Sequence, residues 1–224
     1  MPKLLFIQAS PRPNDSVSLA AASGFLSRLR DKLPALAVDS LDLWRTELPE
    51  FDGAALAAKY ARLAGRDLEP HEAAAWRTIE AMVARLDAAD LVLIATPMWN
   101  FGIPYKLKHW IDLVTQPGLA FSFDPMRGYS PLLRARPTLA IVASAGDYSE
   151  GPSWGRPDLA TPYLEAALRF IGLGEITVVG QGPTMGPQNA IATARERTQE
   201  RLAALADTFA ARLAGSAGGF ARAS

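Results

Sequence analysis

Short apolar runs alternate with stretches of helical periodicity along almost the whole of this 224-residue chain. From residue 16 to residue 33, apolar residues recur at alternating steps of three and four, which predicts an amphipathic helix. Later stretches around residues 70–87, 106–116, 159–172 and 188–213 also favour helices. The apolar runs predict five buried strands at residues 3–9, 37–43, 91–95, 138–144 and 175–180.

This alternation predicts an α/β fold, a doubly wound five-stranded parallel sheet with helices on both faces. Ligands of such sheets bind beyond the carboxyl ends of the strands. We therefore expect function in three loops, at residues 10–18, 97–102 and 144–151, which follow the first, third and fourth apolar runs.

Two segments interrupt the alternation and are interpreted as insertions. Residues 50–69 have room for a short helix, and residues 117–134 contain Leu119-Ala-Phe-Ser-Phe123 and a Gly-Tyr turn, which predict a β-hairpin insertion. We expect one domain over residues 1–214 and a flexible, Gly/Ala/Ser-rich C-terminal tail over residues 215–224.

Composition excludes several classes of function. Lysine plus arginine and aspartate plus glutamate both number 23, so no net positive charge favours nucleic acid. The chain has no cysteine and only two histidines, which argues against disulfides and metal sites. Its apolar runs are far shorter than the roughly 20 residues of a membrane-spanning helix. We expect a cytoplasmic protein with neither a nucleic-acid partner nor a membrane anchor.

Three serines lie in the first loop. Ser10, Ser16 and Ser18 place hydroxyl groups around a turn that ends at a helix N-terminus, where free N–H groups and the helix dipole favour a phosphate. Neither Gly-x-Gly-x-x-Gly nor a Walker A sequence occurs there. A simpler interpretation also holds for this loop, in which Ser16 only caps the helix.

Aromatic and amide side chains follow the third apolar run. Met98, Trp99 and Phe101 can form an apolar wall for a planar ring system, Asn100 and loop N–H groups can bind its polar edge, and Gly102 permits close approach. The alternative is a hydrophobic loop that covers the core, with Asn100 turning the chain.

The run Pro97-Met-Trp-Asn-Phe-Gly-Ile-Pro-x-x-Leu-Lys-x-Trp-Ile-Asp112 resembles the signature of flavodoxin-like, FMN-dependent NAD(P)H azoreductases and quinone reductases. Ser10 followed by Ser16-Val-Ser18 is similar to that family's phosphate loop. Tyr148-Ser-Glu-Gly-Pro152, Thr161-Pro-Tyr-Leu164 and Phe170-Ile-Gly172 resemble its later segments in the same order. The resemblance covers essentially the whole chain.

The resemblance implies an FMN site at the carboxyl edge of the sheet. Its phosphate would be held by Ser10, Ser16, Val17 and Ser18. Its isoalloxazine would be held by Pro97, Met98, Trp99, Asn100, Phe101, Ser144, Ala145, Gly146 and Asp147. No side chain is then required as a catalytic acid or base, because flavin N5 carries the hydride.

The resemblance further implies a ping-pong enzyme that passes two electrons from NADH or NADPH to quinones or azo compounds. The family forms homodimers, so Phe121 and Phe123 of the hairpin would wall a substrate cavity at the subunit interface. Plain hairpin packing is the alternative role for both rings. A non-enzymatic FMN electron carrier of the flavodoxin type is the alternative function, which the balanced charge disfavours.

One segment departs from the family pattern. Members often have Ser-Arg-Gly-Gly where this chain has Ser144-Ala145-Gly146-Asp147, without the arginine and with one glycine fewer. A carboxylate at this position would either repel a reduced, anionic flavin or point to solvent, so the sequence predicts altered redox behaviour.

Overall fold

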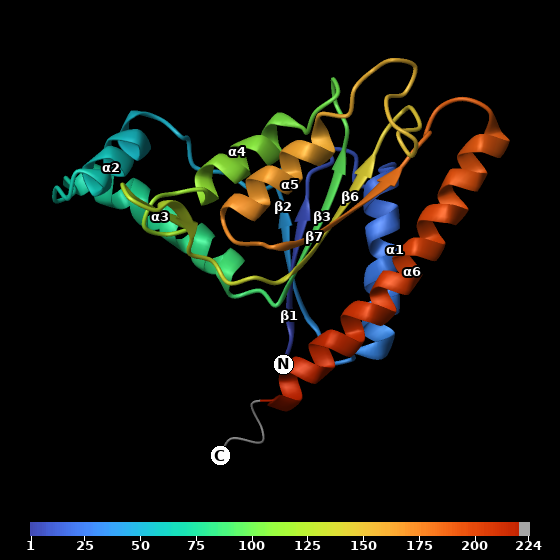
Figure 1. Cartoon of the computed structure of the whole chain (residues 1–224), viewed down its shortest axis with the longest axis horizontal. Helices are drawn as coiled ribbons and strands as arrows, with labels where there is room; N and C mark the ends of the chain where they lie inside the picture. The colour runs from blue at the N-terminus through green and yellow to red at the C-terminus, as the bar shows by residue number, and fades with distance from the viewer. Residues whose placement is uncertain (220–224) are drawn as a thin grey trace.

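A computed structural model describes residues 1–219, and a five-stranded parallel sheet lies at its centre (Figure 1). The strand order is β2-β1-β3-β6-β7, so β1 and β3, separated in sequence by β2, lie side by side. This order confirms the predicted doubly wound parallel sheet. The strands of the sheet are β1 Lys3–Gln8, β2 Ala37–Asp42, β3 Leu91–Pro97, β6 Pro137–Ala143 and β7 Glu175–Gln181.

Helices cover both faces of the sheet (Figure 1). One core cluster joins the sheet to α1 and α6, and a second, larger cluster joins its other face to the remaining helices. The helices are α1 Val17–Lys32, α2 Gly53–Leu63, α3 Pro70–Asp87, α4 Tyr105–Val114, α5 Ala160–Phe170 and α6 Gln188–Gly219. Every residue of β6 is buried, as the uninterrupted apolar run predicts for a strand covered on both sides.

Local sequence signals set the helix boundaries. Ser16 caps α1 by accepting a hydrogen bond from the Leu19 N–H, and Pro70 opens α3 behind a capping box of Glu69 and Glu72. The last helix runs beyond the predicted end at residue 213, through the first residues of the predicted tail, to Gly219. The rest of that predicted tail, residues 220–224, lies outside the described residues.

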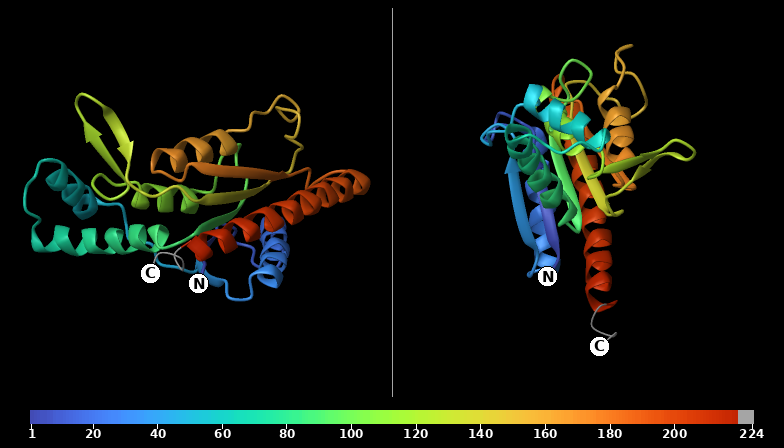
Figure 2. Two further views of the ribbon diagram at one scale, coloured as in Figure 1. Left: turned by 60° about the horizontal axis from the view of Figure 1, so that its bottom comes forward. Right: turned by 90° about the vertical axis from the view of Figure 1, so that its left-hand side faces the viewer.

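The predicted hairpin forms from β4 Phe121–Asp124 and β5 Gly128–Pro131, which pair antiparallel. Both views of Figure 2 show it standing out from the body of the molecule. The segment expected to hold a short helix forms α2. Within residues 1–219, no helix is both long and apolar enough to cross a membrane.

Ion pairs also link helices α1 and α6. Asp207 on α6 lies 3.0 Å from Arg28 Nε and 3.2 Å from Lys32 Nζ, both on α1. The hydrogen bond from Arg28 is the main cause that lowers the pKa of Asp207 from 3.8 to about 2. The ionised carboxylate therefore stabilises the fold at pH values above its unfolded-state pKa, and this contribution is lost as the pH falls from about 4 to about 2.

We expect Asp207→Asn to lower the free energy of unfolding slightly near neutral pH, because all three side chains are about half exposed. The difference from wild type should shrink as the pH falls through the window from about 4 to about 2. Urea unfolding of both proteins across this pH range measures it. A difference that stays constant with pH would show that the carboxylate's charge contributes nothing.

Candidate functional site

The three predicted loops meet at one edge of the sheet. They follow β1, β3 and β6, which are adjacent strands in its middle. The Ala9 N–H donates to the Ala95 carbonyl at 2.9 Å, and the Met98 N–H donates to the Ala143 carbonyl at 2.7 Å, so each loop is tied to its neighbour where it leaves the strand. The chain reverses its direction of winding between β1 and β3, and ligands bind at such a switch point in open α/β sheets.

Two of the three serines of the first loop, Ser16 and Ser18, lie together at the start of α1. Ser16 Oγ lies 3.2 Å from Ser18 Oγ and accepts from the Leu19 N–H at 3.3 Å. Ser10 and Ser18 are buried, and Ser10 Oγ accepts from the Arg12 N–H at 3.4 Å. Hydroxyl groups held beside the free N–H groups of a helix N-terminus have the donor character that a phosphate requires. Val17 follows the cap as the first residue of the helix.

The second loop makes a tight turn. Trp99 and Gly102 exchange two backbone hydrogen bonds of 2.9 Å, and the two residues between them have positive φ, 47° at Asn100 and 72° at Phe101. A positive φ is common for asparagine and costly for phenylalanine. The turn leaves Trp99 38% exposed and Phe101 40% exposed at the sheet edge, beside the strand-end residues Pro97 and Met98. Strained, exposed aromatics of this kind are typical of functional loops.

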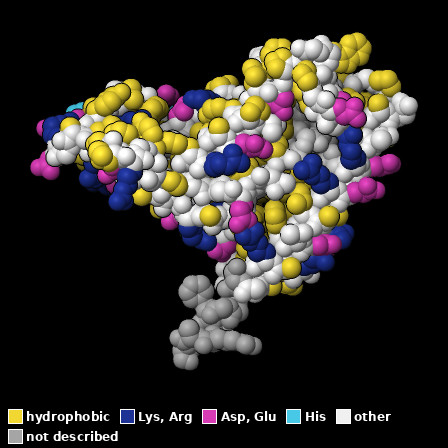
Figure 3. Space-filling view, viewed as in Figure 1, with side chains coloured by type: hydrophobic (Ala, Val, Ile, Leu, Met, Phe, Trp, Pro, Cys, Tyr) yellow, Lys and Arg dark blue, Asp and Glu magenta, His cyan; other side chains and the backbone are white. Residues whose placement is uncertain are grey.

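Hydrophobic side chains are also visible over the loops at the carboxyl end of the sheet in the space-filling view (Figure 3). They extend beyond the second loop, since Trp154 in the segment after β6 is 94% exposed. A rim of this composition suits a flat apolar ligand better than a small ion.

Trp44, which was not predicted from the sequence as a site residue, joins the first two loops. Its indole Nε1 donates to the Ala9 carbonyl at 3.0 Å, immediately before Ser10. Its ring centroid lies 5.7 Å from that of Trp99 and 5.4 Å from that of Tyr105. The available signal was its place two residues after the end of β2, at the same edge of the sheet.

The third loop is fastened to the segment after β7. The Ser144 N–H donates to the Gln181 carbonyl at 3.1 Å, and the Thr184 hydroxyl donates to the Ser144 carbonyl at 3.0 Å. Ser144 Oγ in turn donates to the Gly146 carbonyl at 2.8 Å, which closes the loop around Ala145. The loop is thus rigid where the family resemblance places the polar edge of a flavin.

Asp147 points to α6. Its carboxylate lies 3.5 Å from Arg197 and accepts from the Ser149 N–H at 2.9 Å. Burial opposes its ionisation, but the hydrogen bonds from Ser149 and the charge of Arg197 outweigh burial and lower its pKa. Both side chains border a cavity of about 400 Å³ between this loop, α5 and α6. Arg197 thus neutralises the carboxylate expected to disturb a reduced flavin, which favours the solvent-directed alternative.

The hairpin phenylalanines lie apart from the three loops. Phe121 packs on Phe170 of α5 with ring centroids 4.9 Å apart, and Tyr129 contacts both rings. Phe123 contacts Tyr129 and is otherwise exposed. Within one chain, then, Phe121 has a packing role and Phe123 is exposed, and the hairpin that carries both stands out from the body of the molecule (Figure 2).

Comparison with known proteins identifies the family. A family model described as a flavodoxin-like fold matches residues 2–205. FMN-dependent NADH:quinone oxidoreductase 1 of Bradyrhizobium diazoefficiens is 49% identical over 209 residues, which cover 93% of this chain and 100% of the relative. FMN-dependent NADH:quinone oxidoreductase 3 of Pseudomonas fluorescens is 42% identical over 215 residues, covering 95% and 99%. The chain belongs to the FMN-dependent NADH:quinone oxidoreductase family.

Solved structures place this family member beside azoreductases. The crystal structure of an azoreductase from Bacillus anthracis str. Sterne has a TM-score of 0.84 at 27% identity and covers 93% of this chain and 100% of that one. A second structure, of an FMN-dependent NADH-azoreductase from Bacillus anthracis str. Ames Ancestor in complex with FMN, has a TM-score of 0.78 at 25% identity, covering 92% and 100%. The shared fold therefore includes all five strands and the three loops.

Proposed function

We propose that this protein is an FMN-dependent NADH:quinone oxidoreductase that also reduces azo compounds. The observation that carries the proposal is the meeting of the serine loop, the Trp99–Gly102 turn and the Ser144–Asp147 loop at the switch point of the sheet. The relatives named above supply the reaction and the donor, NADH.

The donor groups at the site fit FMN. Ser10, Ser16 and Ser18, together with the N–H groups of the first turn of α1, would hold its phosphate. The Met98–Phe101 turn and the Ser144–Asp147 loop would hold its isoalloxazine. When bound, FMN supplies two-electron chemistry at flavin N5, with NADH as donor and a quinone or azo compound as acceptor in a ping-pong cycle.

The chain's own part in this function is binding and orientation. Asn100 and Phe101, both with positive φ, give the aromatic turn its shape. The two backbone hydrogen bonds between Trp99 and Gly102 hold the ends of the turn together. Trp99 and Phe101 exclude water from the sheet edge by their apolar surface. Positioning two flat molecules in contact removes much of the entropic barrier to their reaction.

A homodimer is part of the proposal. On the hairpin Met126 is 93% exposed, and Phe123 and Tyr129 are exposed beside it. An apolar hairpin of this kind suits a partner subunit, and in a dimer its aromatic rings would reach a substrate bound in the partner's site. Sedimentation velocity measures the oligomeric state directly.

Visible absorbance and turnover test the function. The purified protein should bind one FMN, NADH should bleach the flavin band without oxygen, and a quinone should restore it. Ser16→Ala should raise the Kd for FMN about tenfold, because it removes a phosphate donor. Ser27→Ala, an exposed position on the same helix, should leave the Kd unchanged.

Two results would contradict the proposal in different ways. Failure of the protein to bind FMN would remove the assigned roles of the serine loop and the aromatic turn. Binding of FMN without NADH oxidation in the presence of a quinone would favour the electron carrier of the flavodoxin type. An unchanged Kd in Ser16→Ala would leave that serine with its capping role alone.

A further inference from the structure

A second strained turn follows the third loop, and the proposed function gives it no role. Ser153 and Arg156 exchange two backbone hydrogen bonds of 3.1 and 3.0 Å, and the two residues between them have positive φ, 55° at Trp154 and 76° at Gly155. The construction repeats that of the Trp99–Gly102 turn. A positive φ is costly for tryptophan, and such strain is concentrated at functional sites. The turn is therefore a candidate functional element.

The turn packs directly on the third loop. A Cβ atom at Gly146 would lie 2.2 Å from Ser153 Oγ and 3.4 Å from Arg156 Nη2, so both side chains lie against the Gly146 backbone. The segment beyond the turn is tied to the second loop, because the Leu159 N–H donates to the Phe101 carbonyl at 2.9 Å. The turn is thus fastened to both loops that are proposed to hold the isoalloxazine.

Arg156 brings a guanidinium to the third loop. Its Nε donates to the Ser153 carbonyl at 3.1 Å, which orients the side chain within the turn. Among residues 1–219, no hydrogen bond or ion pair of its Nη1 or Nη2 is found. An arginine side chain stays charged at any physiological pH. A positive charge with free N–H donors therefore lies beside Gly146.

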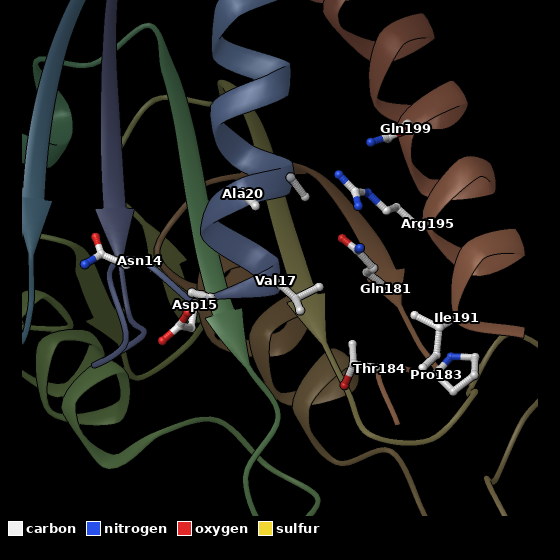
Figure 4. A pocket seen from close by; sticks show the side chains of 12 residues that line it. Asn14, Asp15, Val17, Ala20, Gln181, Pro183, Thr184, Ile191, Arg195 and Gln199 are labelled. Atoms are coloured by element: carbon white, nitrogen blue, oxygen red, sulfur yellow. The ribbon is translucent and has the colours of Figure 1, made fainter. Parts of the chain in front are cut away.

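The α6 side of the third loop supplies no excess of positive charge. The cavity there is lined by three carboxylates and two guanidinium groups, those of Asp147, Asp158, Glu165, Arg197 and Arg201. Another arginine of α6, Arg195, extends toward α1 and borders a cavity beside the serine loop, which no residue of the third loop lines (Figure 4). The third loop itself has no cation, with Ala145 and Gly146 between Ser144 and Asp147. Arg156 is thus the cation that can give this loop a positive field.

We infer that Arg156 stabilises reduced FMN by placing its positive charge beside the third loop. This inference rests on the proposed function. The isoalloxazine carries a negative charge in reduced, anionic FMN and none in oxidised FMN, so a guanidinium beside its binding loop favours the reduced form. Tighter binding of the reduced form raises the midpoint potential of the bound flavin, which makes its reduction by NADH more favourable.

Midpoint potentials of FMN bound to three variants test this inference. Arg156→Gln should bind oxidised FMN with the wild-type Kd and reduced FMN about tenfold more weakly, because water screens an exposed guanidinium and limits its effect. For a two-electron couple, this ratio lowers the midpoint potential by about 30 mV. Arg156→Lys keeps the charge and should have nearly the wild-type potential. Arg30→Gln, at an exposed arginine in the last turn of α1, changes the net charge equally and should leave the potential unchanged.

The outcomes separate this inference from the proposed function. Absence of FMN binding by the wild-type protein would overturn both. Bound FMN with one potential in wild type and Arg156→Gln would overturn this inference alone. An equally low potential in Arg156→Gln and Arg156→Lys would also overturn it, because the Nε hydrogen bond to Ser153, and not the charge, would then be what matters. Equal shifts in Arg156→Gln and Arg30→Gln would show a general effect of net charge and would contradict a role specific to this turn.

Discussion

Gly182→Ala is expected to weaken FMN binding by about tenfold or more. Gly182 follows β7 and packs directly on the third loop: a Cβ atom there would lie 2.2 Å from the Gly146 carbonyl oxygen and 2.5 Å from Ser144 Oγ. Real Cβ atoms do not approach backbone this closely, so the loop from Ser144 to Asp147 must move. That loop is the one proposed to hold the isoalloxazine, and a displaced loop would lose the contacts proposed for the ring.

Gly180→Ala is the matched control, because a Cβ atom at this position, two residues earlier in β7, meets nothing within 4 Å. Flavin fluorescence titration of both variants gives the Kd values, and the far-UV circular dichroism spectrum reports whether each variant is folded. Gly182→Ala with the wild-type Kd would show that the third loop does not contribute to flavin binding. An equal loss of affinity in both variants would show a general effect of substitutions in β7.

The fold could be predicted in detail because its signals are local. The five apolar runs and the helical stripes between them correspond to the five parallel strands and their helices. The hairpin was predictable from Leu119-Ala-Phe-Ser-Phe123 and the turn that follows. The end of the last helix was not predictable in this way, because alanines that favour helix continue past residue 213 while the glycines among them suggest a break.

The candidate site was predictable only in part. Loops that follow buried strands can be read from the sequence, and the three chosen ones do meet at one edge. The residues that hold these three loops in place lie in other parts of the chain. Trp44 follows β2, and Gly182 and Thr184 follow β7, and only the strand order and the folded backbone show that they touch the first and third loops. Likewise Arg197, which neutralises Asp147, lies fifty residues away in sequence.

The largest effect on stability is expected from Gly172→Ala. Gly172 lies two residues after the end of α5 and has a φ of 108°, which a residue with a side chain rarely adopts. A Cβ atom there would also lie 2.2 Å from the Leu133 carbonyl oxygen, in the segment that returns from the hairpin. Backbone strain and this overlap together should cost about 3 kcal/mol or more, which corresponds to a fall in Tm of about 6 to 12 °C.

Gly174→Ala is the matched control for Gly172→Ala. A Cβ atom at Gly174 would make only ordinary contacts of 3.8 and 4.0 Å, and the φ of this residue is not in the positive range. Its Tm should stay close to that of wild type, as measured by differential scanning calorimetry. Similar Tm values for the two variants would show that the end of α5 and the segment that returns from the hairpin can move apart without loss of stability. We expect the Tm values of the two variants to differ, because the end of α5 holds the hairpin in place. Phe170, two residues before Gly172, packs on Phe121 and Tyr129. Loss of that support in Gly172→Ala should therefore also weaken the proposed dimer, whose hairpin needs a fixed orientation to reach the partner subunit.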